Sequence, residues 1–361
     1  MRGGVGARAM SPRRRRGLAR LGILALLVVL IWSTQPNKRL GARRQRAQHT
    51  ADLDASLKSE WDADHLPQAC EAELAAVLPV DHNVSNPTLA RSRLYGNFAR
   101  GLDEQGLSVF GTNAGGATSQ GLGLSALFDF SATSGRVTAK LERLTIPVRA
   151  IVIPLPARAP AAARIHQATV RVLGKEFPPS GGARGGGDAV WYQDASIYHF
   201  SVFHASHHLD PHTASGPEAQ EEASGIRSVA RVSCPIEAVI ERVVVTPSGV
   251  VMALWNVRGG TEPSELREGL RRALPHAPKK QIVADDVILH TTLARLLRPP
   301  EGEADFGAEA ARRATAALTA SLCGVQATLP VLWFVHEHDK LALALRGKYT
   351  PHPMTLECKR M

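Results

Sequence analysis

Two short segments of this chain each carry a histidine followed two positions later by a hydroxyl residue. The first pair is His199 and Ser201, the second is His290 and Thr292, and apolar residues flank both. Side chains two positions apart on a β-strand point to the same face, roughly 7 Å apart. Each segment therefore presents an imidazole beside a hydroxyl. Two such pairs supply two proton-transfer groups and two hydrogen-bond donors, which is what cleavage of a phosphodiester without a metal ion requires.

The motif alone is weak, because a third pair, His204 and Ser206, also fits it. That pair differs in its surroundings, since the apolar run ends there and the polar stretch 207–211 follows. Apolar flanks on both sides favour strands within a sheet, with the hydroxyls turned into a cleft, and so select the first and last pairs. The alternative interpretation is that His199 and His290 are hydrogen-bonded sheet histidines with a purely structural role.

The segments around these pairs resemble the two-histidine (2H) phosphoesterase superfamily. Within it they are similar to the RNA ligase-like and cyclic nucleotide phosphodiesterase proteins of membrane-anchored plant and algal type. The resemblance covers roughly residues 145–350, whereas the segment from about 61 to 140 matches nothing in it. It rests on the two histidine patterns, 91 positions apart, and on the stretches SIYHFSVFHASHH (196–208), IERVVVTPSGVVMALW (240–255) and ILHTTLARLL (288–297).

The resemblance implies a fold and a set of roles. The fold is α+β and bilobal, with two antiparallel sheets flanking a central cleft and helices outside. His199 and His290 would be the catalytic acid and base, in an order that depends on which bond is broken. Ser201 and Thr292 would bind the substrate phosphate. No metal and no other cofactor is expected.

The net charge of +10 invites a nucleic-acid interpretation, but its distribution argues against a long polynucleotide. Residues 1–46 hold twelve Lys and Arg and no acidic residue. The rest of the chain has 31 basic residues (43 less 12) against 33 acidic ones. Binding of long nucleic acids relies on many phosphate contacts from a basic surface. The expected partner is therefore a small cyclic phosphodiester or a short RNA end.

The N-terminus has the pattern of a targeting or anchoring segment. The apolar run 21–32 follows seven Lys and Arg and precedes five more. It is short for a membrane span, and no small-residue cleavage site follows it. We expect a signal anchor with its N-terminal end in the cytosol and the catalytic part in the lumen of the secretory pathway. An organellar transit peptide is the alternative, because the first 51 residues are rich in Arg and free of acid.

Four cysteines, all widely spaced, are compatible with that location without deciding it. They contain no C-x-x-C pair, so a zinc site is not supported. Four cysteines allow three disulfide pairings, and four free thiols are an equal alternative. The glycosylation sequence at Asn83 is compatible with a lumen. The cysteines are Cys70, Cys234, Cys323 and Cys358.

Composition and periodicity divide the chain into six segments. The expected order is a basic cytosolic tail (1–20), the anchor (21–33), a polar stem (34–60), an N-terminal extension of unknown role (61–145), the catalytic domain (146–350) and a tail (351–361). Within the catalytic domain the patterns predict helices over 161–173, 217–232, 262–274 and 304–322. They also predict a strand over 148–154 and two hairpins, 236–246 with 250–257 and 328–335 with 341–345.

Other residues are weaker candidates. Four histidines, at 204, 207, 208 and 212, form a cluster that we interpret as a solvated loop and not as a metal site. Trp255 is more typical of a strand core than of a base-stacking surface. Strand alternation places Arg295 on the face opposite to Thr292, which disfavours phosphate binding. The group His336, Glu337, His338 and Asp339 is expected at the surface.

The sequence therefore predicts a metal-independent phosphodiesterase that hydrolyses a 2′,3′-cyclic nucleotide or a cyclic phosphate at an RNA end. One alternative is a module that binds nucleotides or RNA ends without turnover. Another is a Golgi glycosyltransferase, which the anchor, stem and domain order suggests. Such enzymes commonly hold a metal-bound nucleotide through a D-x-D motif, and the match at 62–64 lies at the stem boundary instead of after an apolar strand.

Overall fold

The structure is a computed structural model, and its described residues fall in one compact unit, Trp61–Met361. The predicted N-terminal tail (1–20), the anchor and the stem lie outside the described residues, as do the D-x-D match and Asn83. Among the residues that are described, no helix is both long enough and apolar enough to cross a bilayer. The described residues are 66–78, 87–110, 122–131, 133, 135–179, 188–299 and 304–359.

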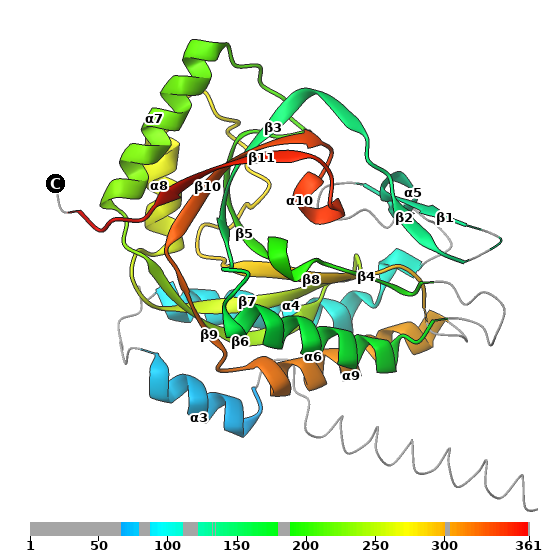
Figure 1. The fold of residues 1–361 in the computed structure, drawn as a ribbon. Helices are drawn as coiled ribbons and strands as arrows, with labels where there is room; N and C mark the ends of the chain where they lie inside the picture. Colours follow the sequence, from blue (N-terminus) through cyan, green and yellow to red (C-terminus); the bar gives the residue numbers. More distant parts are fainter. Residues whose placement is uncertain are drawn as a thin grey trace, which may run out of the picture. The chain divides into compact units, whose positions relative to one another are not determined.

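Two antiparallel sheets form the framework, and all pairings between described strands are antiparallel (Figure 1). The four-stranded sheet has the order β11-β10-β3-β5, and the five-stranded sheet has the order β4-β8-β7-β6-β9. The first contains β3 (Arg143–Pro154), β5 (His199–Ser206), β10 (Val331–Asp339) and β11 (Tyr349–Thr355). The second contains β4 (Val190–Tyr192), β6 (Ile236–Val245), β7 (Val250–Gly259), β8 (His290–Leu296) and β9 (Gln326–Leu329). A small hairpin joins β1 (Phe128–Phe130) and β2 (Val137–Ala139).

Helices cover both sheets. α6 and α9 lie side by side against the five-stranded sheet, and α4 lies on its other face (Figure 1). Neighbouring residues of β6 show this, because Val243 bonds to Thr319 of α9 while Val244 packs with Tyr95 of α4. The helices are α3 (Gln68–Val77), α4 (Pro87–Gln105), α5 (Leu124–Leu127), α6 (Pro160–Glu176), α7 (Gly216–Val232), α8 (Pro263–Ala273), α9 (Ala304–Leu322) and α10 (Ala342–Leu345), with 3₁₀ turns η1 (Ser108–Phe110) and η2 (Ala195–Ile197).

Local sequence explains where these helices begin. Ser215 and Glu218 form a reciprocal capping box before α7, whose first turn also holds Pro217. Proline is favoured there because its missing N–H would have no partner in the helix. Pro160 and Pro263 stand in the same way at the starts of α6 and α8.

The main core joins both sheets, since inward residues of β3, β5, β6, β7 and β8 belong to one buried cluster. Phe200 of β5 meets Trp255 of β7 edge to face, with ring centroids 5.4 Å apart. The expectation that Trp255 is a core residue is confirmed, because it is fully buried, as are Tyr198 and Phe200.

The predicted α+β class with two antiparallel sheets and outer helices is confirmed. The hairpin of β6 and β7 and the bounds of α9 also agree with the sequence patterns. The predicted second hairpin is wrong, because residues 342–345 form the helical turn α10, and β10 pairs instead with β11. Leu341, in the left-handed region at φ 54°, turns the chain into that helix. The sheet thus continues past residue 350 into the segment expected to be a tail.

Two disulfides select one of the three possible pairings. Cys70 of α3 joins Cys323 after α9, and Cys234 before β6 joins Cys358 after β11. Disulfides persist in oxidising compartments and are rare in the cytosol. The two disulfides therefore indicate an oxidising, secretory-pathway environment.

Candidate functional site

The four predicted site residues lie at the starts of β5 and β8, two strands that contact each other. All four are partly exposed, and each alternates with a buried neighbour. In β5, Ser201 pairs with Val152 on the face turned away from the main core, where Val152 packs with Val335 and Leu343. Each histidine therefore shares an accessible face with its hydroxyl.

His290 and Thr292 also lie on a sheet face turned away from the main core. Their partners on β7 are Leu254 and Met252, which pack in the cluster beneath α4. The intervening residue Thr291 is fully buried. The two histidine–hydroxyl pairs are thus presented by contacting strands of different sheets.

The buried guanidinium of Arg267 in α8 joins the two histidine strands. It donates to the carbonyls of Val202 at 3.1 Å and Ser201 at 3.3 Å on β5. It also donates to the carbonyls of Asp286 at 2.6 Å and Ile288 at 2.9 Å, just before β8. Because β5 is an edge strand, these bonds occupy part of its open edge. Nothing in the sequence pattern marked Arg267, since a helix arginine is ordinarily solvated.

A second side chain completes the edge of β5. The amide of Gln281 accepts from the N–H of His204 at 2.7 Å and donates to the carbonyl of the same residue at 3.1 Å. It therefore pairs with β5 as a neighbouring strand would. On this side of β5 the structure describes no strand partner, and side chains from residues 260–290 bind its backbone instead.

The N-terminal extension holds the other histidine strand through Tyr95 of α4. The Tyr95 hydroxyl lies 2.7 Å from the carbonyl of Trp255, and 3.0 Å from both the N–H and the carbonyl of Leu289. Leu289 directly precedes His290. Burial of Tyr95 raises the pKa of its phenol, so the hydroxyl stays protonated. The segment of unknown role in the sequence is thus built into the site.

A buried polar network keeps α4 in place. Arg91 donates to the carbonyl of Val287 at 2.9 Å and pairs with the carboxylate of Glu262. Glu241 accepts from Asn256 at 2.7 Å and from Ser92 of α4 at 2.6 Å. Buried polar groups of this kind are costly unless each has a partner, and here each of these contacts supplies one. The residues that precede His290 are therefore held from both α4 and α8.

The two imidazoles have different surroundings. The Nδ1 of His199 lies 2.9 Å from the carbonyl of Ile197, whereas the Nδ1 of His290 is buried without a hydrogen-bond partner among the described residues. Burial lowers the pKa of His199, and the Ile197 hydrogen bond opposes this. Burial lowers the pKa of His290 to about 4, with the nearby positive charges of Arg267 and His199 adding to the effect. Burial thus favours the neutral form of both imidazoles, and only for His199 does a carbonyl at Nδ1 oppose this.

Arg295 shares the face of Thr292, contrary to the expectation from strand alternation. The register of β8 shifts, so that Thr292 pairs with Met252 and Arg295 pairs with Val250, two residues that pack in the same cluster. Leu293 is the extra residue of this bulge, which reverses the alternation. A β-bulge cannot be read from the apolar pattern, and this is why the sequence placed Arg295 on the wrong side.

Arg295 is half-buried, and one nitrogen of its guanidinium is enclosed by the protein. Within the part of the chain that the structure describes, its Nη1 has no hydrogen-bond partner. Burial lowers its pKa to about 10, which leaves it charged at neutral pH. A buried charge without a partner is costly, and a bound phosphate would relieve that cost. Arg295 is thus a candidate ligand for the substrate phosphate beside Thr292.

The histidine cluster after Ser201 is not a solvated loop. His204 and Ser206 belong to β5, and His204, Ser206 and His207 are all buried. Both ring nitrogens of His207 are engaged, with the carbonyl of Lys280 at 2.9 Å and the N–H of Asp210 at 3.2 Å. Across the described stretches of the chain, no three His, Cys, Asp or Glu side chains come together as a metal site.

Glu337 is another residue that the sequence placed wrongly. It was expected at the surface, but only 7% of it is exposed. It pairs with Val148 at the centre of the four-stranded sheet and accepts from the N–H of Leu343 at 2.8 Å. Burial raises its pKa to about 7. Glu337 lines a pocket that also contains His199 and Ser201.

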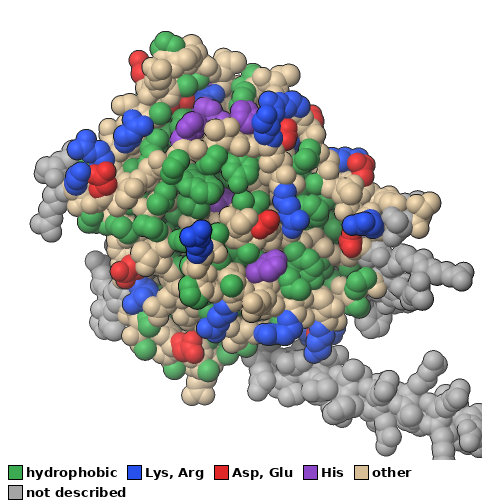
Figure 2. All heavy atoms as spheres, in the orientation of Figure 1, with side chains coloured by type: hydrophobic (Ala, Val, Ile, Leu, Met, Phe, Trp, Pro, Cys, Tyr) green, Lys and Arg blue, Asp and Glu red, His purple; other side chains and the backbone are tan. Residues whose placement is uncertain are grey.

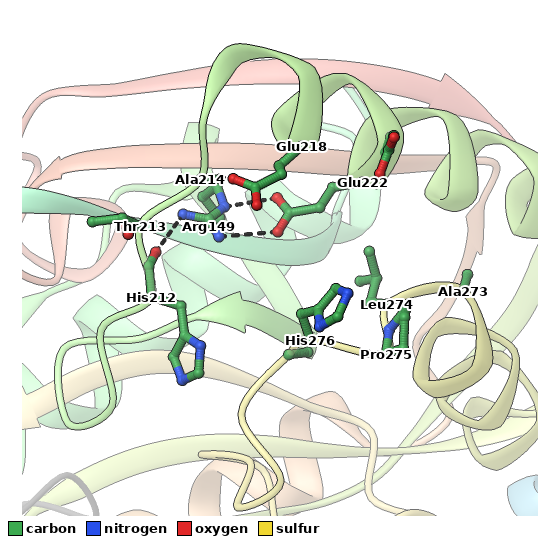
Figure 3. A pocket seen from close by; sticks show the side chains of 12 residues that line it. Arg149, His212, Thr213, Ala214, Glu218, Glu222, Ala273, Leu274, Pro275 and His276 are labelled. Carbon is green, nitrogen blue, oxygen red and sulfur yellow. Dashed lines mark hydrogen bonds and ion pairs between the residues drawn. The ribbon is translucent and has the colours of Figure 1, made fainter.

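A larger pocket, of about 360 Å³, lies between α7 and the end of α8 and does not contain the predicted site residues. Figure 3 shows Arg149 there, bound to Glu222 and His212. Its guanidinium donates to the carboxylate of Glu222 at 2.7 and 2.9 Å and to the carbonyl of His212 at 2.7 Å. Glu218 and Glu221 also line this pocket. Its only arginine is thus occupied and its carboxylates repel anions, so a phosphate fits the histidine site better.

Comparisons with known proteins give little beyond this geometry. No protein-family model matches the sequence, and no curated protein matches it. Among solved structures, the chain is similar to the protein TT0787 of Thermus thermophilus. That similarity has a TM-score of 0.39 and 16% sequence identity, and covers 59% of this chain and 100% of the other.

Proposed function

We propose that the protein is a phosphodiesterase that hydrolyses a small cyclic phosphodiester with two histidines and no metal ion. The observation that carries the proposal is the placement of two histidine–hydroxyl pairs on contacting strands. On the face of one pair lies Arg295, whose Nη1 has no hydrogen-bond partner among the described residues. The resemblance to the 2H phosphoesterase superfamily supports the same assignment. A 2′,3′-cyclic nucleotide, or a cyclic phosphate at the end of a short RNA, is the proposed substrate.

The different surroundings of the two imidazoles favour one division of labour. His290, with its low pKa, is neutral and takes a proton from the attacking water. The water oxygen bonds to phosphorus, and the bond from phosphorus to the leaving oxygen breaks. His199, whose Nδ1 is held by the Ile197 carbonyl, gives its Nε2 proton to that leaving oxygen. The products are a phosphate monoester and a free hydroxyl.

Charge on the non-bridging oxygens grows during this reaction and needs stabilisation. Ser201 and Thr292 donate hydrogen bonds to those oxygens, and Arg295 supplies a positive charge in a poorly hydrated position. Arg267 is not free for this role, because its N–H groups are bound to four backbone carbonyls. Two imidazoles and one guanidinium together perform the proton transfers and the charge stabilisation for which other enzymes use metal ions.

A small substrate also agrees with the surface. Figure 2 shows hydrophobic side chains gathered in the middle of one face, with Lys and Arg scattered among acidic residues. That face has no continuous basic surface of the kind that follows a polynucleotide backbone. For location, we propose that the catalytic part lies in the lumen of the secretory pathway, anchored through the segment 21–33.

The test is hydrolysis of 2′,3′-cyclic nucleotides in excess EDTA by the protein lacking residues 1–46. We expect turnover that His199→Ala and His290→Ala each reduce by about a thousandfold. The exposed His338, which donates to or accepts from Thr350 at 2.9 Å, provides the control variant His338→Ala. Unchanged activity in either site variant, or activity that EDTA abolishes, would contradict the mechanism. Nucleotide binding without turnover in a folded protein would indicate a binding module instead.

A further inference from the structure

The pocket that His199 and Ser201 help to line also contains residues that the proposed reaction does not use. Its volume is about 60 Å³, so it takes a small part of a ligand. Aliphatic side chains line one part of it: Val148, Ala150, Val152, Ile282, Leu341 and Leu343. Besides His199 and Ser201, its polar lining consists of Glu337, His204, His207 and His208. A small concavity in which aliphatic side chains surround convergent polar groups is typical of a small-molecule subsite.

His204 reaches this pocket because of a bulge in β5. Val202 is the extra residue, so Ser201 pairs with Val152 while His204 pairs with Ala150. His204 therefore faces the same way as Ser201, although the two are three positions apart. Only 9% of His204 is exposed, and its Nδ1 has no hydrogen-bond partner among the described residues. Its main chain is fixed on both sides by Gln281, so the ring is held in position.

The wall that carries Leu341 and Leu343 is a strained turn. Leu341 and Arg346, which flank α10, both have positive φ, at 54° and 60°. Neither is a glycine, and such residues persist only where the surroundings impose them. The second sheet does so here, because Gln193 donates to the carbonyl of Leu343 at 2.7 Å and Trp191 to that of Ala344 at 3.2 Å. The pocket is thus built in advance of any ligand.

The polar groups decide what the pocket takes. Above a pH of about 7 the Glu337 carboxyl is ionised and repels a second phosphate, so the anion stays with Ser201, Thr292 and Arg295. A metal ion is disfavoured, because both nitrogens of the adjacent His207 are already engaged. Burial lowers the pKa of His204 to about 3, so its ring is a neutral hydrogen-bonding group. An uncharged group with an N–H or O–H donor satisfies both Glu337 and His204.

We infer that this pocket is a recognition subsite for the uncharged, donor-bearing group attached to the phosphodiester, with Glu337 accepting its N–H or O–H and His204 bonding beside it. The inference rests on the proposed function, since it places the phosphate at the adjacent histidines. The donor comes either from the edge of a nucleobase or from a hydroxyl of a sugar or polyol. Both sources present the same chemistry to the pocket, and the probes below separate them.

The test uses equilibrium binding at pH ~8.5, where Glu337 with its pKa of about 7 is ionised. It is done in a His290→Ala background that prevents turnover and in the unaltered chain at low temperature. Four probes share the cyclic phosphate: guanosine 2′,3′-cyclic phosphate, uridine 2′,3′-cyclic phosphate, glycerol 1,2-cyclic phosphate and propane-1,2-diol cyclic phosphate. Only the last has no free donor. We expect at least one donor-bearing probe to bind about tenfold more tightly than the propanediol compound. Preference for the nucleosides identifies a base, and preference for the glycerol compound identifies a hydroxyl.

Glu337→Gln is the decisive variant, because its amide oxygen still accepts from Leu343 while the charged acceptor is lost. We expect it to reduce the tenfold preference in affinity to within about twofold and to leave the affinity for the propanediol compound unchanged. Glu221→Gln, at an exposed position of α7, is the matched control. His204→Gln serves as a second variant if Glu337→Gln does not fold. Equal binding of all four probes, an unchanged preference in the variants, or no binding of any probe overturns the inference. Absence of turnover with these preferences intact would reject the catalytic proposal alone.

Discussion

The two histidine strands carry the same motif in different structural settings. β5 is an edge strand whose free side is bound by the side chains of Arg267 and Gln281. β8 is an interior strand between β4 and β7, and Tyr95 of α4 bonds to the residue before its histidine. The first imidazole has a carbonyl partner at Nδ1, whereas the second has none among the described residues and lies near a buried guanidinium. Identical residues thus become chemically distinct through the groups that surround their strands.

The strongest test of this comparison removes the group that the strands share. Arg267→Met keeps the aliphatic volume but leaves four buried carbonyls without their donor. We expect the free energy of unfolding to fall by at least about 3 kcal/mol, measured by urea denaturation with the disulfides intact. Arg271→Met, one turn further along α8, removes only exposed ion pairs with Glu268 and Asp286 and should cost less than about 1 kcal/mol. Equal losses would mean that Arg267 does not join the strands.

The next test concerns a residue that only the β8 side possesses. Arg295→Gln should lower kcat/KM by about a hundredfold, because a charge-assisted contact to the phosphate is lost. Arg295→Lys should restore part of the activity, since the charge returns without the paired geometry. Arg298→Gln is the control, because Arg298 lies beyond the strand and stacks 5.3 Å from the ring centre of Phe130. If Arg295→Gln lowers only the free energy of unfolding and leaves kcat/KM unchanged, Arg295 does not bind the substrate.

The smallest expected effect is a shift of the pH optimum below the ordinary pKa of histidine. This shift compares the two imidazoles directly. The base must be neutral, so kcat/KM should rise as the pH increases through the pKa of His290, about 4. The acid must be protonated, so kcat/KM should fall as the pH rises through the pKa of His199, which burial lowers below its ordinary ~6.5. The profile should be bell-shaped with its maximum below pH ~6.5, and activity should fall about tenfold per pH unit beyond the second limb. An optimum above neutral pH would contradict the assignment of His290 as the base and His199 as the acid.

Much of the fold follows from the sequence because its periodicities are strong. α9, the hairpin of β6 and β7, and the two histidine strands all correspond to apolar patterns at the expected period. The capping box at Ser215 and the first-turn prolines Pro160 and Pro263 mark helix starts that tertiary packing does not change. The hydroxyl partners Ser201 and Thr292 were identified for the same reason, since they precede the bulge in each strand.

The residues that the sequence misplaced depend on packing that periodicity does not report. Single-residue bulges at Val202 and Leu293 turn His204 and Arg295 to the face of the hydroxyls, although simple alternation places them on the other side. Glu337 is buried because its strand lies between two others and α10 bonds to its carboxylate. Arg267 contacts backbone groups of β5 that are 65 and 66 positions away along the chain, and Tyr95 contacts the carbonyl of Trp255, 160 positions away. Such contacts are fixed only when the whole domain has folded.

The disulfide between Cys70 and Cys323 also determines how mechanical load would pass through the molecule. It closes a loop with a sequence separation of 253, and that loop contains β5, β8 and every residue assigned to the histidine–hydroxyl site. If the two ends of the chain are pulled apart, tension enters at Cys70, crosses to Cys323 and continues toward the C-terminus. β5 and β8 lie outside this shortest path, whereas β10 and β11, between Cys323 and Cys358, lie on it. Tension on the termini should therefore load the β10–β11 side of the four-stranded sheet before it reaches β5 at the other edge.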